Sequence, residues 1–195
     1  MKISLYVLVA IGFASCHFYY TEYAYELKRN DSRFVHIDNK EGASIYISAD
    51  VKTTTNKHKG LWQTASGPYI IGLGIGGHLE LLDYIQIDNV LLIKHNNTIN
   101  LFEGDFSIYD TSLGRIYYEK EKAAFLYDRK IKSQFSSRDR IGIGFKNDEI
   151  IYKDVASFEI VINLTLQYKD NNSESKEIRY KFFRKKNSEI VLPSA

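Results

Sequence analysis

Three glycines within residues 68–85, PYIIGLGIGGHLELLDYI, have the spacing of a phosphate-binding loop. Gly72, Gly74 and Gly77 match the pattern in which backbone N–H groups hold a dinucleotide pyrophosphate where a strand meets a helix. That chemistry needs a helix long enough to lie along a parallel sheet and an acidic residue about 20 positions later. Strand-like alternation resumes at Tyr84 almost at once. The sequence therefore favours a strand with glycines along one face over a nucleotide site.

The same alternation of glycine with large apolar residues recurs later in the chain. Residues 71–76 alternate isoleucine and leucine with glycine, and residues 140–146, RIGIGFK, do the same at Gly142 and Gly144. Glycines on one face of a strand let a backbone or an aromatic ring approach closely. Two interpretations stay open: a glycine-floored groove that receives a ligand or a partner's chain, and tight internal packing, which we favour.

Residue types for catalysis are present without the spacing that catalysis needs. The histidines show no paired spacing, and neither a zinc-ligand cluster nor a Gly-x-Ser-x-Gly elbow occurs, so we expect no metal and no cofactor. The segment HLELLD puts His78, Glu80 and Asp83 within one turn, which is more often a solvated face than a site. The enzymatic alternative is a cell-envelope hydrolase with two carboxylates about 5 to 10 Å apart.

The only cysteine follows an apolar N-terminal run. Residues 1–15, MKISLYVLVAIGFAS, have one lysine near the start, an apolar stretch and two small residues, which is the layout of a cleaved export signal. The apolar stretch is too short for a membrane-spanning helix, which takes about 20 residues. The sequence therefore predicts an exported protein whose mature chain begins near Cys16.

The tetrapeptide FASC at residues 13–16 resembles the lipobox of bacterial lipoproteins, although Phe13 departs from the usual leucine. The resemblance covers only the leader. It implies diacylglycerol on the Cys16 sulfur, cleavage before Cys16 and acylation of the new amino group, for example with palmitate, so that lipid anchors the protein to a membrane. His17, where aspartate would retain a lipoprotein in the inner membrane, implies the periplasmic face of the outer membrane.

The alternative is an ordinary signal peptide with an incidental cysteine, and hence a secreted protein. A secreted protein stabilised by disulfides would carry an even set of cysteines, so the single Cys16 favours the lipid anchor. In a eukaryotic setting four Asn-x-Ser/Thr triplets would be glycan acceptors, although such triplets arise easily by chance in this composition. These begin at Asn30, Asn96, Asn163 and Asn171.

Composition indicates one soluble, strand-rich domain. Among the 195 residues, 44% are apolar and 26% charged, which excludes disordered and multi-spanning proteins. The net charge of +2 is too small to imply a nucleic-acid partner. The 15 tyrosines and 11 phenylalanines favour pleated sheets over helices. We divide the chain into a signal at 1–15, a lipidated aromatic segment at 16–32 and a β domain at 33–195.

Period-two alternation beyond residue 33 predicts several strands joined by turns. Ile45 and Ile47 begin one strand, residues 53–60 (TTTNKHKG) follow as a polar loop, and residues 84–102, 106–120 and 157–186 form hairpins. Residues 116–132 fit a short helix or two strands equally well. The predicted fold is all-β, a single antiparallel sandwich or open barrel.

The aromatic segment after Cys16 also has two interpretations. Phe18 and the tyrosines after it suit either a membrane interface or a first strand packed on the domain, and we favour the strand. Residues 176–186, KEIRYKFFRKK, interleave basic and aromatic residues, a pattern that binds anionic partners or, more commonly, protects an edge strand. Trp62 is expected in the core more than on the surface. The candidate contact residues are Trp62, Tyr69, Arg179, Lys181 and Arg184.

Together these observations predict a lipid-anchored bacterial protein that binds a protein partner in the envelope and is not an enzyme. An accessory of an envelope assembly and a toxin-immunity protein fit equally well. A glycan or small-ligand receptor is the alternative. We expect no nucleic-acid partner, because an exported protein seldom meets nucleic acid.

Overall fold

The computed structural model describes residues 18–28, 32, 34–38, 44–59, 62–110, 115–117, 140–147, 150 and 154–191. The described elements are strands and two short 3₁₀ turns, so the predicted all-β class is confirmed. In chain order they are β1 (Phe18–Leu27), β2 (Phe34–Asp38), β3 (Ile45–Lys59), β4 (Trp62–Gly77), η2 (Leu79–Leu81), β5 (Leu82–Lys94), β6 (Asn97–Asn100), η3 (Leu101–Glu103), β7 (Phe106–Asp110), β8 (Arg115–Tyr117), β9 (Arg140–Asn147), β10 (Ser157–Tyr168) and β11 (Ser173–Val191).

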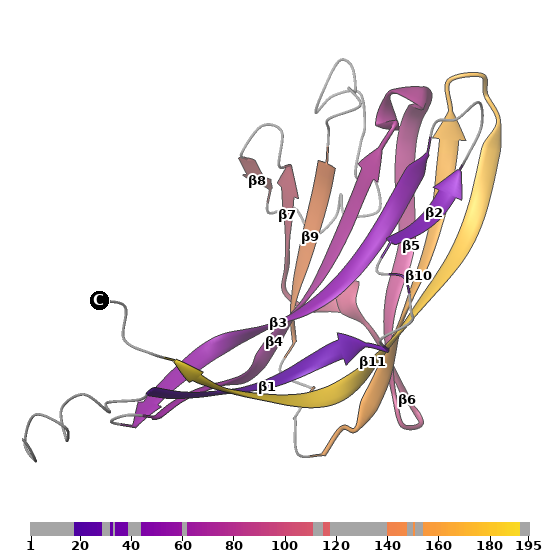
Figure 1. Ribbon diagram of the computed structural model, residues 1–195. Coiled ribbons are helices and arrows are strands. Elements are labelled where there is room, and N and C mark those ends of the chain that lie inside the picture. Colours follow the sequence, from indigo (N-terminus) through magenta and orange to yellow (C-terminus); the bar gives the residue numbers. More distant parts are fainter. Residues whose placement is uncertain are drawn as a thin grey trace, which may run out of the picture.

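The strands form one mixed sheet that folds over on itself (Figure 1). Its order is β6-β5-β10-β11-β1-β4-β9-β7-β8, with β3 added beside β4 and β2 beside β3. Neighbours run antiparallel except for β1 and β4, which are parallel. Among the described strands the sheet is not closed into a barrel, and its two halves share one core, as in a sandwich.

Four strands, β1, β3, β4 and β11, each belong to two parts of the molecule. The first half of β11 pairs with β10 and its second half with β1, while β4 pairs with β1 at its start and with β9 further on. The outer halves form a four-stranded extension, here called the arm, which projects at the lower left of Figure 1. The arm comprises residues 18–22, 55–59, 62–66 and 186–191; the remaining strands form the body.

The arm corrects one prediction and confirms another. Residues 53–60 were expected to be a polar loop, but β3 continues to Lys59, which pairs with Trp62 of β4. The loop prediction was wrong because backbone pairing, which needs no apolar face, extends the strand past the core. The aromatic residues after Cys16 do form a first strand docked on the domain, because β1 lies between β11 and β4. Residues 18–27 thus belong to the same sheet as the residues after 33.

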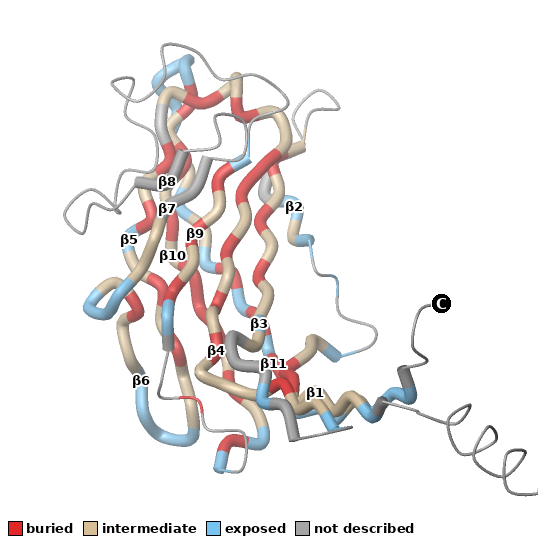
Figure 2. The backbone as a smooth tube through the Cα atoms, turned by 90° about the vertical axis from the view of Figure 1, so that its left-hand side faces the viewer, coloured by how far each residue is buried: buried red, intermediate tan, exposed pale blue. Residues whose placement is uncertain are grey.

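The core lies between the two halves of the body. Along β10 the residues with even numbers from Phe158 to Leu166 are at most 2% exposed, as their alternation predicts. β4, β5 and β9 turn alternate apolar residues, among them Ile71, Leu92 and Ile143, toward the same core. η3 places the ring of Phe102 at 5.3 Å from that of Phe145 on β9. Figure 2 shows the resulting alternation of buried and intermediate residues along these strands.

Tyrosine hydroxyls link strands across the core. Tyr25 donates to the carbonyl of Val155, and Tyr180 of β11 donates to the carbonyl of Ile47 on β3, each at 2.7 Å. The rings of Tyr25 and Tyr69 meet edge to face with centroids 5.1 Å apart. A buried phenol needs a partner for its O–H, and a strand carbonyl supplies one. Tyr25 and Tyr180 therefore help to join segments that meet across the core.

The glycines lie where their alternation placed them. The residues between them on β4 point into the core, and the two glycine rows pair directly, Gly72 with Gly144 and Gly74 with Gly142. Side chains of β3 lean over this outer face, since a Cβ atom at Gly72 would lie 2.1 Å from the Asp50 carboxylate. The close approach is therefore made by this chain's own side chains, as in the packing interpretation.

The predicted hairpins are present where the structure describes them. β5 and β6 turn at His95, whose φ is 51°, and β10 and β11 turn at Asn171, whose φ is 65°. β7 and β8 also pair as predicted. The predicted signal, Cys16 and most of the ambiguous 116–132 segment, from residue 118 on, lie outside the described residues.

Candidate binding surface

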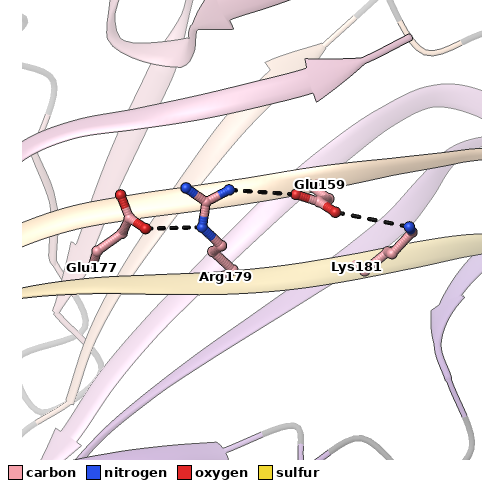
Figure 3. A network of polar contacts seen from close by, with 4 residues as sticks. All are labelled: Glu159, Glu177, Arg179 and Lys181. Atoms are coloured by element: carbon pink, nitrogen blue, oxygen red, sulfur yellow. Dashed lines mark hydrogen bonds and ion pairs between the residues drawn. The ribbon is translucent and has the colours of Figure 1, made fainter.

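The basic run of β11 forms a ladder of ion pairs on the outer face of the body (Figure 3). The Nε of Arg179 donates to Glu177 at 2.8 Å, and its Nη1 lies 3.6 Å from Glu159 of β10. Glu159 also lies 3.8 Å from Lys181 Nζ. The hydrogen bond to Glu177 raises the pKa of the Arg179 guanidinium. Two of the predicted contact residues therefore already face acids of the same chain.

The basic run is paired in the same way where β11 approaches the arm. Lys185 Nζ donates to Glu26 of β1 at 2.5 Å, and this hydrogen bond lowers the pKa of the Glu26 carboxyl. Lys186 Nζ lies 5.9 Å from the ring centroid of Tyr23. Arg184 is exposed but has the opposite parity along β11, so it does not join the face of Arg179. The run is thus mainly a neutralised sheet surface, and exposed ion pairs of this kind add little stability.

Tyr69 and Trp62, both on β4, have opposite environments. Tyr69 is 1% exposed and donates its hydroxyl to the carbonyl of Tyr23 at 2.7 Å, so it belongs to the core and not to an accessible contact surface. Trp62 is 56% exposed, and the expectation that it lies in the core was wrong. The reason is the double role of β4: its first residues lie in the arm, and only the later ones enter the body.

Trp62 is part of a row of exposed apolar side chains across the arm. Register places Tyr19 of β1 beside Trp62 on one side and beside Ile190 of β11 on the other. The rings of Tyr19 and Trp62 stack with centroids 4.4 Å apart. Trp62 is 56% exposed, Ile190 57% and Tyr19 40%. We call these three residues the apolar row; sequence reasoning missed Tyr19 and Ile190, because only long-range register brings them together.

β3 presents an open strand edge. It pairs with β2 only from Ile45 to Ser48, whereas β4 lies along its other side as far as Lys59. From residue 49 to 59, no described strand pairs with the free edge of β3. Lys52 and Lys57 are exposed on this stretch, which is how soluble proteins discourage unwanted strand pairing. This edge is long enough to accept a strand from another protein.

Two residues of the segment HLELLD, His78 and Glu80, contact each other. They meet at η2, with 2.6 Å between Nδ1 and Oε1, and both are partly exposed. The other carboxylate oxygen of Glu80 is buried and makes no hydrogen bond within the described part of the chain. No three His, Cys, Asp or Glu residues of the described ranges are grouped so that they could hold a metal ion.

Within the described residues, no helix has the length and apolar character needed to cross a membrane. Comparison with family profiles, curated proteins and solved structures finds no match to the chain.

Proposed function

We propose that this chain is a lipid-anchored bacterial envelope protein, on the periplasmic face of the outer membrane, that works by binding another protein and not by catalysis. The lipobox-like residues before Cys16 support the anchor. The observation that carries the binding role is the open edge of β3. An extended peptide that adds to such an edge gains main-chain hydrogen bonds, while alternate side chains give specificity.

The dimensions of the β3 edge suit strand addition. Residues 49–59 span about 33 Å at about 3.3 Å per residue, and an added strand of ordinary length covers about half of that. Thr53 is polar and β-branched, and such residues favour an extended backbone without adding an apolar surface. This edge therefore accepts a partner strand without making the protein prone to self-association.

Adjacent proline substitutions test the binding role. Successive N–H groups of a strand point to opposite sides, so one of Lys52→Pro and Thr53→Pro removes an N–H that faces β4, and the other removes one that faces the open edge. The variant that lacks the N–H facing β4 loses stability. The variant that lacks the N–H facing the open edge keeps the fold, which circular dichroism and thermal unfolding check. It no longer captures the protein that the wild type captures from native envelopes, which mass spectrometry identifies.

Two outcomes decide the binding proposal. Loss of the same captured protein in the folded proline variant supports it, and the identity of that protein separates an envelope assembly from a secreted toxin. Capture that is equally strong in the wild type and in the folded variant would rule out binding at this edge.

The anchor is tested separately with a metabolic palmitate label. The wild type incorporates the label and Cys16→Ser does not, because the thioether to diacylglycerol is what commits a lipoprotein to further acylation. Equal labelling of the two chains, or none in either, contradicts the anchor and leaves the result at the β3 edge untouched.

A further inference from the structure

The apolar row lies at the end of the arm, where three strands begin or end. Tyr19 lies at the start of β1, Trp62 is the first residue of β4, and Ile190 lies near the end of β11. Single exposed apolar residues are common on soluble proteins, but adjacent ones on neighbouring strands form a patch that indicates a contact. Here the three residues lie at one end of the arm, which projects from the body in Figure 1.

The next row of the arm is polar. Two residues further along β1, Thr21 pairs with Thr64 on one side and with Ser188 on the other, and the hydroxyls of Thr21 and Ser188 lie 3.4 Å apart. The polar row follows the apolar row by about 7 Å along the strands. The arm therefore changes from apolar to polar within one row, which is the depth over which a bilayer interface changes from acyl chains to water.

The residue types of the apolar row suit a bilayer interface. Tryptophan and tyrosine combine an apolar ring with a polar N–H or O–H, and they concentrate at the level of lipid headgroups. Lys57 of β3, which pairs with Thr64 in the polar row, is exposed, and a long basic side chain reaches lipid phosphates from this depth. Contact of these residues with a bilayer does not require a partner surface of complementary shape.

The chain itself brings this patch to the membrane. Cys16 precedes Tyr19 by three residues, and a chain spans at most about 3.6 Å per residue, so a lipid on Cys16 starts within about 11 Å of the apolar row. β1 begins at Phe18, which leaves almost no flexible tether between the anchor and the sheet. The row must therefore lie close to the headgroups whenever the anchor is inserted.

We propose that the apolar row of Tyr19, Trp62 and Ile190 docks into the interfacial layer of a phospholipid bilayer, as a second membrane contact beside the lipid on Cys16. The inference rests on the proposed anchor. The acyl chains on Cys16 hold the chain at the membrane, and docking of the row adds a contact between the folded protein and the lipid. Docking of the row also fixes the angle of the arm, and with it the direction in which the β3 edge faces a partner.

The test uses Trp62 as an intrinsic probe, because it is the only tryptophan of the chain. The mature chain with Cys16→Ser, which cannot carry the lipid, is mixed with vesicles of phosphatidylethanolamine and phosphatidylglycerol. We expect the emission of Trp62 to shift to the blue, and lipids brominated near the headgroup to quench it more than lipids brominated at the chain ends. Co-sedimentation with the vesicles measures the partition coefficient.

Two substitutions give a matched comparison. Ile190→Ser removes an exposed apolar side chain from the row and lowers the partition coefficient about tenfold. Phe34→Ser removes a side chain of similar exposure, 48%, from β2 in the body and leaves partition unchanged. Circular dichroism confirms that both variants fold.

The outcomes separate this inference from the anchor proposal. A blue shift, with a lower partition coefficient for Ile190→Ser than for Phe34→Ser, supports docking even if the palmitate label is absent. Palmitate labelling without any shift of the Trp62 emission supports the anchor and overturns docking. An equal effect of Phe34→Ser and Ile190→Ser also overturns it. A Trp62 shift that needs an envelope protein and not lipid would assign the row to a protein partner instead, and so would refute the proposal.

Discussion

Tyr180 offers the sharpest test of how the two halves of the sheet are joined. Its side chain is 3% exposed, and its hydroxyl donates to the carbonyl of Ile47 at 2.7 Å, so one hydrogen bond links β11 with β3. Burial raises the pKa of Tyr180 from 10.0 to about 12, since a phenolate would lose its hydration. The substitution Tyr180→Phe keeps the ring and removes both the hydrogen bond and the titration.

The size of the effect follows from the two pKa values. The folded pKa lies above the unfolded one, so the stabilisation is complete below about pH 10 and is lost as the pH rises through about 12. The two pKa values differ by an amount that corresponds to about 2.7 kcal/mol in the free energy of unfolding, of which about 1.4 kcal/mol is lost by about pH 11. At neutral pH, the variant should be less stable than the wild type by about 1 to 3 kcal/mol, because the Ile47 carbonyl loses a donor.

Urea unfolding of both chains at about pH 8 and about pH 11, followed by circular dichroism, measures this difference. The other tyrosines titrate in both chains and cancel. We expect the free-energy gap between wild type and Tyr180→Phe to shrink by about 1.4 kcal/mol at the higher pH. A gap that is the same at the two pH values would refute the argument that burial of this phenol controls its ionisation.

Three further predictions concern the sheet. Gly77→Ala should lower the free energy of unfolding in urea by about 1 to 3 kcal/mol, because φ is +103° and a Cβ atom would lie 2.1 Å from a backbone oxygen. Gly72→Ala should lower it less, because only the side-chain carboxylate of Asp50 must move. Equal losses in the two variants would contradict this. Ile160→Ala should cost about 2 to 5 kcal/mol, since Ile160 is fully buried, and a smaller loss would indicate a looser core. Lys185→Gln should raise the pKa of Glu26, because the hydrogen bond that lowers this pKa would lose its charge. NMR titration of the Glu26 carboxyl carbon measures the pKa. An unchanged titration would show that the pair does not form in solution.

Sequence patterns predicted those parts of the fold that depend on a single strand and its turn. Alternation from Phe158 to Tyr168 identified the buried face of β10, and the repeated glycine pattern identified β4 and β9 as strands. These patterns are readable because side chains of a strand point alternately to its two faces, whatever the strand pairs with. The pairing of Gly72 with Gly144 was not readable, since it depends on register.

The candidate surface was much harder to predict. Trp62 was expected in the core, and nothing in its neighbourhood showed that β4 begins outside the body. Residues 53–60 were expected to be a loop because they lack an apolar face, yet the edge of β3 on which the binding proposal depends runs through them. In both cases the local composition is polar, and only backbone pairing with distant strands decides the structure.

The sequence alone determined the strand class, the positions of the hairpins, the core alternation and the hypothesis of a lipid on Cys16, because each of these follows from neighbouring residues. Only the tertiary structure decided that Tyr19, Trp62 and Ile190 share a row, that Arg179 and Lys181 are matched by acids, and that no described strand pairs with the outer edge of β3 beyond Ser48. The physical reason is that strand register is set by contacts between residues far apart in the chain, and no local pattern encodes it.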